Sequence, residues 1–127
     1  MMIGRSYTHS HFIMSFFSDL EKKMDQSLHQ QQNVDNLLRK CSCNDKVSAF
    51  LLASRRLDRA MSNQMSKSTT PLDAVERLKN NITIMDHIHN PLESYGVIST
   101  GSDDICEMLP KQTVLADKFT NKIESNN

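Results

Sequence analysis

The stretch Lys40-Cys41-Ser42-Cys43-Asn44-Asp45-Lys46 (KCSCNDK) separates two amphipathic patterns in this sequence. Ser42 and Asp45 have the spacing of a capping box, and Asn44 is itself a favoured N-cap residue. A helix is therefore predicted to end near Cys41, and another to begin a few residues later. Because so short a connection cannot carry the chain back along a helix of roughly 40 Å, it favours an antiparallel helix pair.

Upstream of this stretch, apolar residues recur every three or four positions from about Ser15 to Cys41. This spacing predicts an amphipathic helix with a narrow apolar stripe, which is typical of a coiled-coil seam. Gln31 takes one core position of the stripe, where a polar residue costs stability but can fix the register. The predicted partner-binding seam on this helix consists of Phe17, Leu20, Met24, Leu28, Gln31, Val34 and Leu38.

Downstream, a second apolar series begins at Val47, and a third helix is predicted from the segment TTPLDAVERL at residues 69–78. Thr70 suits the N-cap, Pro71 the first helical position and Asp73 the partner in a capping box. Asn90-Pro91 is predicted to end this helix, because proline lacks the N–H that the helix needs. The face predicted to meet a partner consists of Val75, Leu78, Ile82 and Met85.

These patterns predict an all-α protein of two to three amphipathic helices, arranged as an antiparallel helical hairpin or a coiled-coil-like bundle. At 127 residues the chain has room for one domain. Three Gly and three Pro are too few for the repeated turns of a β-sandwich or barrel. We expect residues 1–14 to be a flexible N-terminal extension, residues 15–90 the helical region, and residues 91–127 a weakly ordered, mostly irregular tail with room for short helices.

The three cysteines are an odd number, whereas the disulfide framework of a small secreted domain uses an even set. Cys41 and Cys43 are separated by one residue, which is closer than the usual spacing of paired zinc ligands. We therefore expect Cys41 to be a small apolar seam residue and Cys43 a turn thiol. Metal binding by this pair stays open, with Cys106 and four histidines as the remaining candidate ligands: His9, His11, His87 and His89.

Motifs for catalysis are missing from the sequence. It has no glycine-rich phosphate loop, no zinc-binding helix with two histidines and a glutamate, and no nucleophile elbow. We therefore expect no catalytic activity and no cofactor, and we expect no metal unless the cysteine pair binds one.

The formal net charge is zero, with 15 basic and 15 acidic residues, so no overall field attracts the chain to a polyanion. Arg55, Arg56 and Arg59 are the candidate contacts to a polyanion, but the aromatic residues that would stack on bases are missing around them. No apolar run reaches the roughly 18 residues of a membrane span. The sequence thus predicts a cytoplasmic protein that meets an organelle at most peripherally, through its partners, and it argues against nucleic acid.

Helices with such narrow stripes bury little apolar area alone, and at roughly 25 cal/mol per Å² the entropy of ordering the chain nearly cancels that gain. Partner helices would supply the missing burial. The predicted function is a non-catalytic helical subunit of a cytosolic multi-protein assembly of the tethering, trafficking or cytoskeletal-scaffold type, which packs with other helical subunits as a hetero-oligomer. The alternative is a free-standing three-helix binding module that uses the basic second helix on an acidic partner or nucleic acid.

Overall fold

The computed structural model of the chain describes residues 2–98 and 103–126, and the side chains of residues 17–95 and 105–126. The described residues form four helices: α1 (Met2–Arg39), α2 (Asn44–Met65), α3 (Pro71–Ile98) and α4 (Asp103–Ser125). No strand occurs among them. The predicted all-α class is therefore confirmed, whereas the predicted number of two to three helices is too low.

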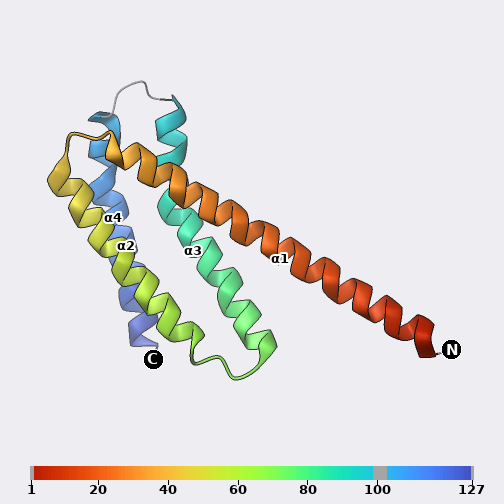
Figure 1. The fold of residues 1–127 in the computed structure, drawn as a ribbon. Coiled ribbons are helices and arrows are strands. Elements are labelled where there is room, and N and C mark those ends of the chain that lie inside the picture. Colours follow the sequence, from red (N-terminus) through yellow and green to blue (C-terminus); the bar gives the residue numbers. More distant parts are fainter. Residues whose placement is uncertain (1, 99–102, 127) are drawn as a thin grey trace.

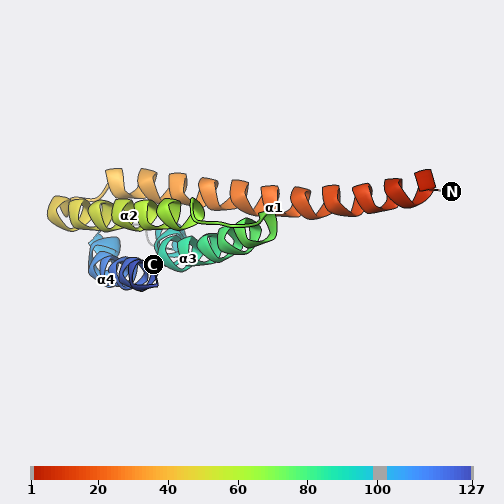
Figure 2. The same ribbon diagram turned by 90° about the horizontal axis from the view of Figure 1, so that it is seen from below.

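The helices α2, α3 and α4 pack together, and α1 crosses them with its N-terminal end projecting away (Figures 1 and 2). In Figure 1, α2 and α4 run in the same direction and α3 runs in the opposite one. The chain reverses direction between Arg39 and Asn44, as predicted. The predicted α1–α2 hairpin is not the main packing unit, however, because α1 packs mainly against α3 and α2 mainly against α4.

The core contains apolar residues from all four helices. The largest side chains that have almost no exposed surface are Val34 of α1, Phe50 and Leu57 of α2, Ile88 and Leu92 of α3, and Leu109 of α4. The chain therefore buries more of its own apolar residues than the sequence pattern indicated, because the long helix α4 contributes an apolar face to the core.

Pro91 lies inside α3, so the prediction that it ends this helix is wrong. A proline at position 91 cannot donate to the carbonyl oxygen of His87, four residues earlier. Gln112 of α4 supplies a replacement donor, since its Nε2 donates to the carbonyl oxygens of His87 at 3.1 Å and Ile88 at 2.8 Å. The helix continues to Ile98 because Gln112 supplies a hydrogen bond to the His87 carbonyl oxygen, which would otherwise have no donor at position 91.

Residues 103–125 form α4, so the prediction of a mostly irregular tail is wrong for them. Leu109, Ala116 and Ile123 recur every seven positions and are buried in the core. This packing holds a helical segment that contains Pro110. Residues 99–102 lie outside the described part of the chain.

At the other end of the chain, α1 begins at Met2, and the predicted boundary at residue 15 is not a helix start. Residues 2–14 contain no proline, so a helix that is formed further along can extend through them at one hydrogen bond per residue. With 38 residues, α1 is about 57 Å long.

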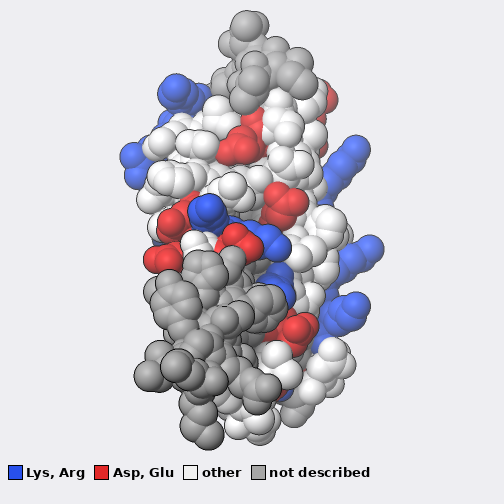
Figure 3. All heavy atoms as spheres, turned by 90° about the vertical axis from the view of Figure 1, so that its right-hand side faces the viewer, with Lys and Arg blue, Asp and Glu red and all other residues white. Residues whose placement is uncertain are grey.

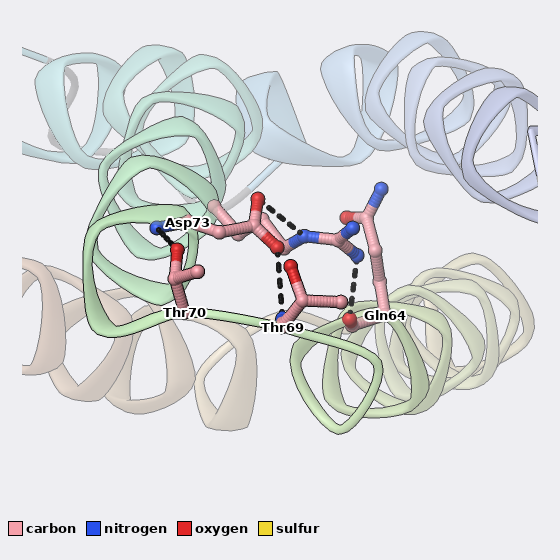
Figure 4. A network of polar contacts seen from close by, with 5 residues as sticks. Gln64, Thr69, Thr70 and Asp73 are labelled. Atoms are coloured by element: carbon pink, nitrogen blue, oxygen red, sulfur yellow. Dashed lines mark hydrogen bonds and ion pairs between the residues drawn. The ribbon is translucent and has the colours of Figure 1, made fainter.

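The connection between α2 and α3 is fixed by a network of polar contacts around Asp73 (Figure 4). The Asp73 N–H donates to Thr70 Oγ1 at 3.0 Å, which confirms the predicted cap. Asp73 Oδ2 accepts from the Thr69 N–H at 3.2 Å, and Arg77 Nε donates to Asp73 Oδ1 at 3.2 Å. The hydrogen bond from Thr69 and, after it, the contact with Arg77 lower the pKa of the Asp73 carboxyl. Arg77 also donates to the Gln64 carbonyl oxygen at 2.7 Å, which joins the end of α2 to the start of α3.

Candidate functional site

An apolar groove of about 620 Å³ lies where α1, α2 and α3 meet, and we name it the α1–α2–α3 groove. Methionine is prominent in its lining, and this flexible side chain adapts to irregular partners. The apolar lining residues are Met24 and Leu28 of α1, Met61 and Met65 of α2, and Leu78, Ile82 and Met85 of α3.

The charged residues that line this groove are Asp25 and Asp58, and its lining includes no lysine or arginine. Burial raises the pKa of the Asp58 carboxyl, an effect that the nearby His89 opposes and Asp35 adds to. Since Asp58 still keeps an exposed surface, this desolvation is partial. The groove therefore combines an apolar lining with negative charge.

Asn81 also lines the groove and is 7% exposed. Its Oδ1 is buried and has no hydrogen-bond partner among the described residues. A buried acceptor without a donor costs about 1–3 kcal/mol. The groove thus contains a polar group that the described residues do not satisfy.

The structure divides the predicted α1 seam into two parts. The C-terminal part joins the core of the chain itself, with Val34 fully buried and Leu38 nearly so. The N-terminal part stays largely exposed: Met24 keeps 44% and Leu28 54% of its surface, and Phe17 is also half exposed. Leu20, which lies between them, is buried. Of the seven residues in the predicted α1 seam, three line the groove: Met24, Leu28 and Gln31.

Gln31 is partly buried, and its Nε2 donates to Ser27 Oγ at 3.3 Å. On α3, Met85 of the predicted face is buried and Val75, Leu78 and Ile82 are partly buried; Leu78, Ile82 and Met85 line the groove, whereas Val75 does not. The structure thus places three predicted residues of each helix in one groove. The sequence interpretation missed the contribution of Met61 and Met65, although their spacing of four indicates one face of α2.

Arg55, Arg56 and Arg59 are exposed on α2, and none of them lines the groove. Figure 3, viewed from the side towards which the N-terminal end of α1 projects, shows acidic residues mainly in the middle of that face, and basic residues both among them and along its edges. A contact of the three arginines with a polyanion stays a prediction.

His89 is buried beside the core. Its Nδ1 lies 2.9 Å from the Met85 carbonyl oxygen, and its ring meets Phe50 edge-on with centroids 6.1 Å apart. Burial lowers the pKa of His89, against the opposing effects of the Met85 hydrogen bond and the Asp58 charge. A neutral imidazole that donates from Nδ1 fits this environment, so His89 is a satisfied core residue.

A cluster of three sulfur atoms lies at the end of the bundle where α1 turns into α2. Cys43, the N-cap residue of α2, forms a disulfide with Cys106 in the first turns of α4, with Cα atoms 6.0 Å apart. Cys41 is buried outside this disulfide, and its Sγ donates to the Leu37 carbonyl oxygen at 3.4 Å. The three sulfurs lie within 4.8 Å of one another.

This cluster corrects two predictions. Cys43 is bonded to Cys106 rather than being a turn thiol, and Asn44 is the first residue of α2 rather than its N-cap. The sequence offered no signal for the bond, because the two cysteines are 63 residues apart and the intervening helices bring them together.

Comparison of the chain with protein-family models, with curated proteins and with solved structures finds no match. None of the helices in the described part of the chain combines the length and the apolar character that a membrane span requires.

Proposed function

We propose that this chain is a non-catalytic helical subunit of a multi-protein assembly, and that an amphipathic helix of a partner subunit packs into the α1–α2–α3 groove. The observation that supports the proposal is the exposure of Met24 and Leu28, about half of each side chain, on the same stripe as the buried Val34 and Leu38. The stripe extends beyond the part that the chain covers with its own residues.

Covering this stripe is favourable. Full burial of a leucine or methionine side chain contributes about 1.5–3 kcal/mol, so covering the exposed halves of Met24 and Leu28 contributes about 1 kcal/mol each. Further area comes from Met61, Met65 and Ile82, which line the same groove. A helix that lies in a groove buries apolar residues at spacings of three and four, which is the geometry that this lining offers.

Charge determines which kind of helix fits. Asp25 and Asp58 line the groove, and no lysine or arginine of the lining neutralises their charge. The partner helix therefore carries basic residues along its apolar stripe. A symmetric pair of this chain would place the same acidic surface on both sides of the interface. Charge therefore favours a hetero-oligomer over a second copy.

The type of assembly remains our proposal from the sequence: a tethering, trafficking or cytoskeletal scaffold in the cytoplasm, which meets an organelle through its partners. A narrow helical seam is the contact through which helices pair in coiled coils. Disulfides are rare in the cytosol. Mass-spectrometric determination of the Cys43–Cys106 redox state in protein taken from cells therefore tests the proposed location: a fully oxidised pair contradicts it.

The function is tested with two matched variants, Leu28→Lys and Leu52→Lys. Both leucines are exposed to a similar degree, 54% and 52%, but Leu28 lines the groove and Leu52 of α2 does not. The full chain is tagged, expressed at its native level, and the co-purifying proteins are quantified by mass spectrometry. We expect one set of proteins to be retained by Leu52→Lys and lost by Leu28→Lys.

A captured protein counts only after a second step. A peptide with the basic amphipathic helix of that protein is titrated against the purified wild-type chain, and we expect Leu28→Lys to weaken its binding at least about tenfold, equivalent to about 1.4 kcal/mol. Equal losses in both variants contradict the proposal. So does concentration-dependent self-association, measured by sedimentation, that Leu28→Lys abolishes, because the groove would then bind a second copy.

The core shared by four helices supports one alternative, since a chain with its own core can fold and act alone. In this alternative the chain is a free-standing binding module that uses Arg55, Arg56 and Arg59 on an acidic partner or nucleic acid. Binding to a nucleic acid would then fall steeply with salt, and further when the three arginines are changed to alanine. Binding that ignores both changes excludes this function.

A further inference from the structure

We propose that Cys41, Cys43 and Cys106 bind one Zn²⁺ ion in the chain whose Cys43–Cys106 pair is reduced. Zinc binds thiolates at about 2.3 Å in tetrahedral geometry, which places bound sulfurs about 3.8 Å apart. The three sulfurs already lie within 4.8 Å of one another. Small rotations of the side chains bring them to this spacing once the sulfur–sulfur bond is open.

The fold brings the three donors together at one end of the bundle. Cys41 and Cys43 come from the connection between α1 and α2, and Cys106 comes from α4. Cys41 and Cys106 are buried members of the hydrophobic core, and Cys43 packs against it. Two ligands separated by a single residue are too few and too close for a zinc finger, but the third donor from a distant helix completes a chelate.

Two of the three donors lie at helix starts. Cys43 is the N-cap of α2 and Cys106 lies near the start of α4, where the positive end of the helix dipole offsets part of the cost of a thiolate in a buried cluster. Lys46 lines a shallow hollow beside Cys43, together with Ser42, Asn44 and Asp45. This open side admits a water molecule as the fourth ligand of zinc.

Soft thiolate donors select zinc, copper(I) or iron–sulfur clusters over hard cations such as Mg²⁺. Binding is balanced as one Zn²⁺ and three thiols giving one zinc tris-thiolate and three protons. A dithiol reductant must first transfer two electrons and two protons to the disulfide, which becomes two thiols while the reductant becomes a disulfide. Zinc and the disulfide therefore exclude each other, because they use the same two sulfurs.

The test uses the full chain, reduced with a phosphine that is then removed, and the same chain with its disulfide intact. Zn²⁺ is titrated in competition with a chromophoric chelator, and Co²⁺ serves as an optical probe of tetrahedral thiolate ligation. We expect one ion per reduced chain, thiolate-to-cobalt charge-transfer bands, and no ion in the oxidised chain.

Three variants assign the ligands: Cys41→Ser, Cys43→Ser and Cys106→Ser. Each is expected to weaken Zn²⁺ binding more than about 100-fold, because even the loss of an indirect contact to a metal ligand costs 10- to 100-fold. Ser42→Ala is the matched control, since it changes the residue between two ligands and should leave affinity unchanged. Circular dichroism of each reduced variant establishes that it is folded, and Cys41→Ser also keeps its disulfide when oxidised.

The proposal is overturned if the reduced wild-type chain binds no Zn²⁺ at micromolar concentration. It is also overturned if Cys106→Ser binds zinc as tightly as wild type, since the site would then not be the cluster that the fold brings together. A Co²⁺ complex without thiolate charge-transfer bands has the same consequence.

Discussion

Replacing Gln112 by leucine should destabilise the protein through two backbone carbonyl groups on a different helix. Gln112 is 7% exposed and donates to His87 at 3.1 Å and Ile88 at 2.8 Å. The carbonyl of Ile88 keeps the N–H of Leu92 as a helical donor, whereas that of His87 faces Pro91, which has none. Leucine fills a similar volume, so the change removes hydrogen bonds more than packing.

The magnitude follows from these two carbonyl groups. The hydrogen bond to the His87 carbonyl is part-buried, so the loss of its donor costs about 1 kcal/mol, at the lower end of the range for a buried acceptor, and loss of the buried hydrogen bond to Ile88 costs about 0.5–1.5 kcal/mol. Gln112→Leu should therefore lower the free energy of unfolding by about 2 kcal/mol. The assay is equilibrium unfolding in urea, with the slope of the transition checked to be unchanged.

A double-mutant cycle with Pro91→Ala isolates the mechanism. Alanine at position 91 restores an N–H that can donate to the His87 carbonyl oxygen, so Gln112→Leu should cost only about 1 kcal/mol in that background. The coupling between the two changes is then at least about 1 kcal/mol. If Gln112→Leu costs the same in both backgrounds, the hydrogen bond to His87 does not explain how α3 tolerates its proline.

Three further predictions concern the core, a helix cap and pH. Leu57→Ala should lower the free energy of unfolding by about 2–5 kcal/mol in urea, whereas Leu28→Ala in the groove should cost less than about 1 kcal/mol, because Leu57 is fully buried and Leu28 half exposed; equal costs would contradict the assigned burial. Thr70→Ala removes the acceptor of the Asp73 N–H and should lower the free energy of unfolding by about 1 kcal/mol, which calorimetry measures. Acidification should destabilise the protein below pH 6.5, because the pKa of His89 is lowered from 6.5 in the folded chain and the unfolded chain then binds more protons; His89→Gln should flatten this part of the stability profile, and an unchanged profile would contradict the buried neutral imidazole.

Features that depend only on residues close together in the sequence could be predicted from it. The turn at residues 40–43 and the cap at Thr70 and Asp73 are of this kind, and the structure confirms both. Pro91 was misleading because the cost of a proline inside a helix depends on what else lies near the backbone. For Pro91 the compensating donor is a glutamine on another helix, which no local pattern can indicate.

The candidate groove could be predicted only in part. Met24 and Leu28 were identified from their spacing, and the structure shows them exposed. Val34 and Leu38 belong to the same stripe, but they are covered by the chain itself, in a core that includes α4. A stripe records which residues avoid water, and it does not record whether the covering residues come from the same chain. That information requires the position of every other helix.

The position of α1 also indicates how the groove could admit a helix. Towards its C-terminal end, α1 is anchored by Val34 and Leu38 in the core. Alongside α3 it is held by two exposed hydrogen bonds, Gln30 to Asp86 at 3.2 Å and Asn33 to Glu93 at 2.9 Å. Exposed polar contacts of this kind contribute about 1 kcal/mol or less each, because water competes for both partners. The wall of the groove that carries Met24 and Leu28 is therefore fixed to α3 in part by contacts that water can replace, and the gain from covering the two side chains, about 1 kcal/mol each, is similar to the cost of losing both hydrogen bonds.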